Sequence, residues 1–78
     1  YGGPDGLDVL RAVWTDVESD LAPHAVALFE ADPRNADAFA AWLRPRPATA
    51  GRAVTVHPDL AGRPRVVEVG ARADRDGP

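Results

Sequence analysis

The sequence contains no cysteine, lysine, methionine, isoleucine or glutamine among its 78 residues. Without cysteine the chain can form neither disulfide bonds nor thiolate metal sites, so its fold must depend on packing alone. Cysteine and lysine are also common nucleophiles in covalent catalysis, and the single serine, Ser19, lies in an acidic stretch. These absences favour a protein that is not an enzyme, and we expect no catalytic residues.

Long apolar runs are also missing. The longest one, residues 38–43, has six residues, whereas a helix needs about 20 to cross a bilayer. No charged segment followed by an apolar one opens the chain, as it would in a secretory leader. We therefore expect no contact with a membrane and a cytoplasmic location.

Groups that titrate near neutral pH are scarce. The two histidines, His24 and His57, are not spaced as metal ligands, and no glycine-rich loop connects a strand to a helix. His57 precedes Pro58 and Asp59, so we interpret it as a structural partner of Asp59 across a turn, and His24 as a surface residue. The sequence thus predicts no metal and no cofactor.

The residues that dominate the sequence are alanine, arginine, aspartate, valine, glycine and proline. They are largely encoded by GC-rich codons, which indicates a high-GC bacterial genome. The polar, turn-rich ends and the missing methionine predict a piece of a longer polypeptide. We expect a linker over residues 1–4, one small globular domain over residues 5–70 and a flexible tail over residues 71–78.

Apolar residues at helical spacing predict three helices. The first covers residues 6–21, and Pro23 then opens a second helix that ends near Ala31, because Pro33 restricts Asp32 to extended backbone angles. Asn35 is the predicted N-cap of a third helix that reaches Leu43. The apolar stripes of the first and third helices comprise Leu10, Val13, Trp14, Val17 and Leu21, and Ala36, Phe39, Ala40 and Leu43.

The segment A-L-F-E-A-D-P-R-N-A-D-A-F-A-A-W-L resembles the junction between consecutive tetratricopeptide repeats, in which one helix ends at Asp-Pro and Asn-Ala opens the next. The resemblance implies a helix-turn-helix over residues 27–43. No second copy follows at the period of about 34 residues that such arrays require, and the chain continues as Arg-Pro-Arg-Pro after Leu43. We interpret the resemblance as a shared local structure and not as membership of that family.

The C-terminal half predicts a β-hairpin. Residues 53–57 and 65–69 are rich in valine and nearly alternate between apolar and polar positions, and residues 58–62 contain the proline, aspartate and glycine of a turn. The fold class is therefore α+β, with a three-helix core followed by a C-terminal β-hairpin. This order of elements is similar to that of a winged helix, in which residues 35–43 would be the recognition helix.

Charge is unevenly distributed along the chain. Residues 1–43 carry eight acidic residues and two arginines, and residues 44–78 carry seven arginines and four acidic residues. An excess of arginine at one end favours a contact with an acidic surface on a partner or on a second copy of the chain. Trp and Arg are also enriched at interface hot spots. The predicted partner-binding residues are Trp42, Arg44, Arg46, Arg52, Arg63 and Arg65.

From these observations we expect a non-catalytic protein–protein interaction or adaptor domain that binds its partner through an arginine-rich hairpin and linker. A winged-helix-like domain that binds nucleic acid is the first alternative, although the proposed recognition helix offers few donors for base edges. A small regulatory fragment that binds a ligand or is catalytic is the second alternative.

Overall fold

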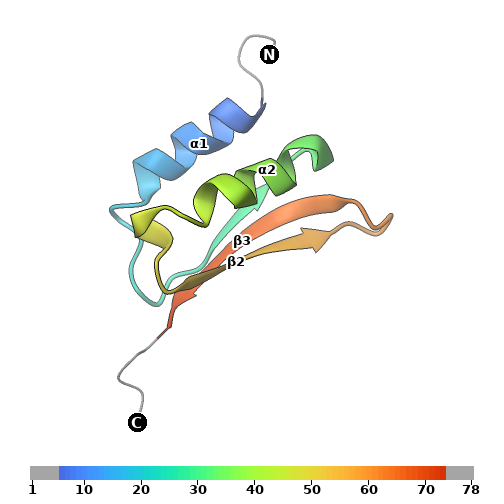
Figure 1. The fold of residues 1–78 in the computed structure, drawn as a ribbon. Helices are drawn as coiled ribbons and strands as arrows, with labels where there is room; N and C mark the ends of the chain where they lie inside the picture. Colours follow the sequence, from blue (N-terminus) through green and yellow to red (C-terminus); the bar gives the residue numbers. More distant parts are fainter. Residues whose placement is uncertain (1–5, 74–78) are drawn as a thin grey trace.

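The computed structural model describes residues 6–73 and contains two α-helices and three strands. Helix α1 (Gly6–Val17) is followed by β1 (Ala27–Glu30), α2 (Pro33–Leu43), the short 3-10 helix η1 (Pro47–Thr49), β2 (Arg52–Pro58) and β3 (Pro64–Arg72). The strands form one antiparallel sheet in the order β1-β3-β2 (Figure 1). The mixed α+β class predicted from the sequence is confirmed.

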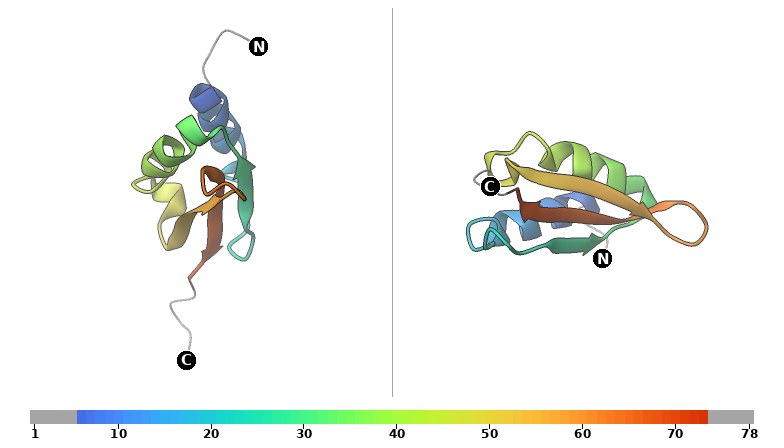
Figure 2. Two further views of the ribbon diagram at one scale, coloured as in Figure 1. Left: turned by 90° about the vertical axis from the view of Figure 1, so that its right-hand side faces the viewer. Right: turned by 90° about the horizontal axis from the view of Figure 1, so that it is seen from below.

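Both helices pack on the same face of the sheet, as Figure 2 shows from two sides. Alternate residues of each strand point to this face, because successive side chains of a strand point to opposite faces. Val67 and Val69 of β3 are fully buried there, and Val54 and Val56 of β2 are half-buried. The buried apolar residues of the core are Trp14, Ala31, Ala36, Phe39, Ala40, Leu43, Val67 and Val69.

A row of four aromatic rings links α1, β1 and α2. The ring of Phe29 lies edge-on to Trp14 at 6.2 Å and to Phe39 at 5.2 Å, and Phe39 stacks on Trp42 at 6.0 Å. Edge-on and offset-stacked rings at these distances attract each other beyond the area that they bury. The row therefore fixes how the two helices sit on the sheet.

The predicted three-helix core is wrong, because the expected second helix over residues 23–31 is strand β1. A short apolar run such as Ala25 to Phe29 fits either a buried strand or a buried helix by periodicity alone. Phe29 points to the core as predicted, but it does so from a strand that pairs with Val66 to Val69 of β3. The helix-turn-helix implied by the tetratricopeptide junction and the winged-helix order of elements are therefore also incorrect.

The ends of both helices differ from the prediction by a few residues. Helix α1 ends at Val17 instead of residue 21, since Ser19 and Asp20 favour turns over helix interiors. Helix α2 begins at Pro33, and its N-cap is Asp32, whose carboxylate accepts the backbone N–H of Arg34 at 2.9 Å. The prediction of Asn35 as the N-cap is therefore wrong, because Asp32 caps the helix and Pro33 occupies the first helical position, which proline favours.

The β-hairpin is confirmed, and its turn is built around one carboxylate. Asp59 Oδ1 accepts the backbone N–H groups of Ala61 at 2.8 Å and Arg63 at 3.0 Å. Gly62 has φ +82°, a conformation that favours glycine. Leu60 at the tip is fully exposed, so the carboxylate and the glycine shape the turn without a buried side chain.

The predicted linker over residues 1–4 lies outside the described residues, as does most of the predicted tail over residues 71–78. Strand β3 continues to Arg72, two residues past the expected end of the domain at residue 70. Within residues 6–73 neither helix has the length and apolar character needed to cross a membrane.

We expect Phe39→Ala to lower the free energy of unfolding by about 3 to 5 kcal/mol, because Phe39 is fully buried and contacts two other rings. Urea denaturation followed by tryptophan fluorescence measures this change. The control Leu60→Ala removes a fully exposed side chain, and we expect a change within about 0.5 kcal/mol. Equal effects of the two substitutions would contradict the assigned core.

Candidate functional site

A shallow hollow lies where β1 ends and α2 begins. It has a volume of about 270 Å³ and is lined by Glu30, Ala31, Asp32 and Arg65. The Asp32 carboxylate is already engaged, because it accepts the backbone N–H of Arg34 and two guanidinium N–H groups of the same residue at 3.1 and 3.3 Å. Of the residues that line the hollow, Asp32 is therefore already used by the helix.

The side chain of Arg34 keeps the pKa of Asp32 below its usual value of 3.8. The hydrogen bond from the Arg34 side chain is the main cause, and the bond from the Arg34 backbone adds to it. Arg65 lowers the same pKa by a weaker charge interaction across the hollow. Asp32 is thus held as a carboxylate, which is the form that caps a helix N-terminus.

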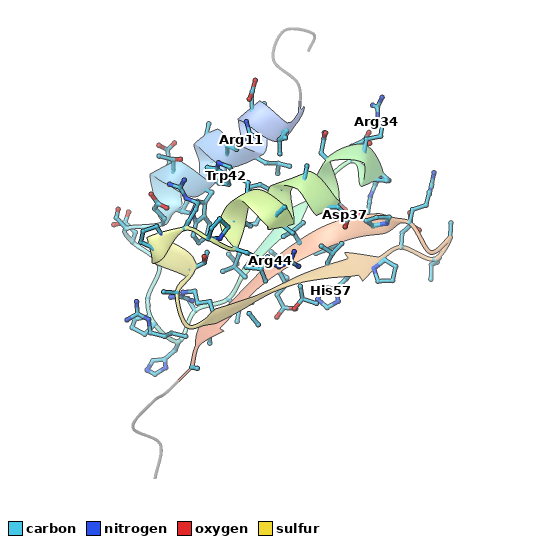
Figure 3. The ribbon with its side chains drawn as sticks, viewed as in Figure 1. Arg11, Arg34, Asp37, Trp42, Arg44 and His57 are labelled. Carbon is cyan, nitrogen blue, oxygen red and sulfur yellow. The ribbon has the colours of Figure 1, made fainter. Side chains whose placement is uncertain are left out.

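The ring of Trp42 on α2 lies near the guanidinium groups of Arg11 and Arg46, and Figure 3 shows Trp42 beside Arg11 of α1. The guanidinium carbon of Arg46 is 4.2 Å from the centroid of the Trp42 ring, and that of Arg11 is 5.8 Å away. Arg46 also contacts the Glu18 carboxylate at 3.3 Å, and these two side chains are only 29% and 23% exposed. We call Arg11, Glu18, Trp42 and Arg46 the tryptophan cluster.

Arg44 and Arg52 bind backbone carbonyl groups. Arg44 Nη2 donates to the Val54 carbonyl at 3.1 Å, on the outer edge of β2. The Arg52 guanidinium donates to four carbonyl oxygens at 2.8 to 3.4 Å, which belong to Leu21, Ala22, Ala25 and Gly70. Arg52 therefore ties the segment before β1 to the end of the sheet.

Arg63 and Arg65 lie at the other end of the sheet, near the hairpin turn. Arg63 Nε is 3.5 Å from Asp59 Oδ2, and Arg65 lines the hollow beside β1. The backbone N–H of Arg63 is the main reason that the pKa of Asp59 lies below 3.8. The Asp59 carboxylate is thereby stabilised in its charged form.

The six predicted partner-binding residues do not form one continuous edge. Trp42 and Arg46 belong to the tryptophan cluster, Arg44 and Arg52 bind carbonyl groups of the sheet and its preceding loop, and Arg63 and Arg65 flank the hairpin turn. The structure gives most of them partners within the chain, which the charge pattern alone did not suggest. Partner binding by these residues stays a prediction.

His57 bonds to Glu68, and not to Asp59 as the sequence suggested. Its Nε2 is 2.6 Å from Glu68 Oε1 on the face of the sheet that the helices leave open. The two residues belong to β2 and β3, so their pairing follows from the register of the hairpin. The residues of the tryptophan cluster that sequence analysis missed are Arg11 and Glu18, whose partners lie too far along the chain for a local pattern to reveal.

Metal-binding groups are not found in the described part of the chain. Residues 6–73 contain no cluster of three or more His, Asp or Glu side chains that could hold an ion.

Comparisons with known proteins point to one kind of enzyme. Release factor glutamine methyltransferase of Deinococcus radiodurans is 47% identical to this chain over 77 residues, which are 99% of the chain and 25% of that protein. MTRF1L release factor glutamine methyltransferase of Homo sapiens is 30% identical over 68 residues, which are 87% of the chain and 20% of that protein. The chain thus spans a quarter or less of the length of these relatives.

No protein-family model matches the chain, and no solved structure matches it. The two relatives nevertheless overturn the prediction of a non-catalytic adaptor domain, because both are methyltransferases and therefore enzymes. The prediction that the chain does not belong with enzymes is wrong for the same reason. That prediction depended on missing nucleophiles, on histidines without metal-ligand spacing and on the lack of a glycine-rich loop, which are arguments about covalent, metal and phosphate chemistry only.

We expect the Glu18–Arg46 pair to stabilise the protein measurably. In a double-mutant cycle with Glu18→Ala and Arg46→Ala, the coupling energy should be about 0.5 to 1 kcal/mol, because both side chains are partly buried. The cycle with Asp8→Ala and Arg11→Ala is the control, since that pair is more exposed and 3.5 Å apart. A coupling no larger than in the control would contradict the role given to Arg46.

We expect the melting temperature to fall as the pH is lowered below 3.8, partly because Asp59 has a lowered pKa in the folded state. Such a group stabilises the fold above its unfolded pKa, and this contribution is lost as the pH falls through the folded pKa. Asp59→Asn should make the dependence shallower, whereas Leu60→Asn in the same turn should leave it unchanged. Thermal denaturation followed by circular dichroism across this pH range measures both variants.

Proposed function

We propose that this chain is part of a longer methyltransferase that transfers a methyl group to a glutamine side chain of a release factor. The observation that carries the proposal is the 47% identity to the Deinococcus radiodurans enzyme over nearly the whole chain. The human relative, with the same activity in its name, supports it independently. The protein partner expected from the sequence is, in this proposal, the release factor itself, and the cytoplasm remains the proposed location.

Within such an enzyme the chain would serve mainly as part of the supporting fold. Several of its polar side chains already hold the local structure: Asp32 caps α2, Asp59 shapes the hairpin turn, and Arg52 binds four carbonyl groups. Its apolar residues bury one face of the sheet under two helices. The proposal therefore places the methyl donor and the reacting glutamine mainly against other parts of the polypeptide.

The test is a methylation assay on the longer polypeptide that carries this chain. It is incubated with a release factor from the same organism and with S-adenosylmethionine that carries a labelled methyl group, and peptide mass spectrometry locates the label. We expect the label on one glutamine of the release factor, and its loss when that glutamine is replaced by asparagine. An active preparation that labels another substrate and leaves the release factor unmodified would refute the proposal.

The contribution of this chain is tested by variants of the same polypeptide. Phe39→Ala disrupts the aromatic row, so we expect reduced methylation that parallels the loss of folded protein. Leu60→Ala is the matched control at an exposed position. If methylation survives after Phe39→Ala has unfolded this segment, the supporting role is wrong, even where the activity itself is confirmed.

A further inference from the structure

Most arginine side chains of residues 6–73 are held by other groups of the chain. Arg44 and Arg52 bind backbone carbonyl groups, and Arg46 contacts the Glu18 carboxylate. Arg65 differs from them, because it is exposed and no other described residue forms a hydrogen bond or an ion pair with its side chain. The guanidinium group of Arg65 can therefore bind a partner without breaking a contact within residues 6–73.

Arg63 is held only by an exposed contact. Its Nε atom is 3.5 Å from Asp59 Oδ2, and its side chain is 66% exposed. Exposed ion pairs of this kind stabilise a protein by about 1 kcal/mol at most. The Asp59 carboxylate has closer partners in the backbone N–H groups of Ala61 and Arg63, so the turn does not depend on the Arg63 guanidinium. We call Arg63 and Arg65 the hairpin arginines.

The hairpin arginines lie on a projection whose backbone is well fixed. In Figures 1 and 2 the turn between β2 and β3 extends past both helices. The Asp59 N–H donates to the Arg63 carbonyl at 2.8 Å, and the Gly62 N–H donates to the Asp59 carbonyl at 2.9 Å. Pro58 and Pro64 pair where the strands enter the turn and restrict the backbone there. A loop that is already ordered loses little conformational entropy when it binds a partner.

This projection lies at the carboxyl ends of β1 and β2. The two strands run parallel, since each is antiparallel to β3, and α2 connects them across one face of the sheet. Glu30, the last residue of β1, pairs with Val66, and the Ala31 N–H donates to the Arg65 carbonyl. In α/β sheets with such connections, ligands bind outside the carboxyl ends of the parallel strands. Arg72, which also has no side-chain partner within residues 6–73, lies at the opposite end of β3.

We propose that the hairpin arginines bind an acidic surface of the release factor and so help the longer enzyme to select this substrate. The inference rests on the proposed function, which makes the release factor the protein partner. Guanidinium groups suit carboxylates, because their N–H groups form paired, charge-assisted hydrogen bonds with the two oxygens. Nucleic acid fits less well, since the chain has a net charge of −3 and binding to phosphates depends on many positive charges.

The test compares how the longer polypeptide and its Arg63→Glu/Arg65→Glu variant bind the release factor. The dissociation constant is measured by isothermal titration calorimetry without a methyl donor, so no methylation step contributes to it. We expect the constant to rise about tenfold or more at low salt, because an attraction becomes a repulsion. The difference should shrink as the ionic strength is raised from about 0.05 M to about 0.5 M, because salt screens exposed charges.

Three further variants serve as controls. Arg72→Glu, compared with Arg65→Glu alone, reverses one charge at the opposite end of β3, and Leu60→Ala alters the same turn without a change of charge. Both should leave the constant within about twofold, because neither changes the charge at the hairpin end. Arg63→Lys/Arg65→Lys keeps the charges without the paired donors, so its constant should lie between those of the unaltered and the glutamate forms.

Circular dichroism shows whether each variant is folded. Unchanged binding by the folded Arg63→Glu/Arg65→Glu variant would overturn the inference while the proposed function stands. An equal loss in Arg72→Glu would also overturn it, as would unfolding of the glutamate variant, since the hairpin arginines would then hold another part of the polypeptide. If the unaltered polypeptide does not bind the release factor, the proposed function fails together with the inference, so the two kinds of failure give different results.

Discussion

The arrangement of the whole molecule depends on the contact between Phe29 and its two aromatic neighbours. Phe29 is the only member of the row on the sheet, and it touches Trp14 of α1 and Phe39 of α2. Each helix is therefore positioned against the same side chain. The fold then places α2 over β3 and β2, which leaves α1 near the open side of β1. A 78-residue chain without disulfides gains much of its cohesion from such a shared contact.

Much of the fold could be predicted from the sequence. The stripe of Ala36, Phe39, Ala40 and Leu43 is fully buried as expected, and the valine-rich hairpin forms with its turn where proline, aspartate and glycine cluster. The exception is the segment before Asp32. Its apolar run suits a strand and a helix equally, and only the partner β3, some forty residues later, makes it a strand.

The candidate site was harder to predict, because the residues that contact one another there lie far apart in the sequence. Glu18 and Arg46 are 28 residues apart, and the carbonyl groups bound by Arg52 lie as many as 31 residues away. Arginines that lie close together in the sequence therefore suggested one contact edge. In the fold, Arg44 and Arg52 bind backbone carbonyl groups, whereas Arg46 contacts Glu18. Function was missed for another reason. Counting nucleophiles addresses covalent catalysis, whereas the similar proteins are methyltransferases, a class that this count does not exclude.

The two ends of the hairpin are secured by different chemistry, and this has a consequence for acid conditions. At the turn, the Asp59 carboxylate accepts two backbone N–H groups, which keep its pKa below 3.8, whereas Arg52 at the far end donates to carbonyl groups, which do not titrate. We therefore expect acid to open the β-hairpin first at its turn. The strand ends beside Arg52 would be the last part to come apart.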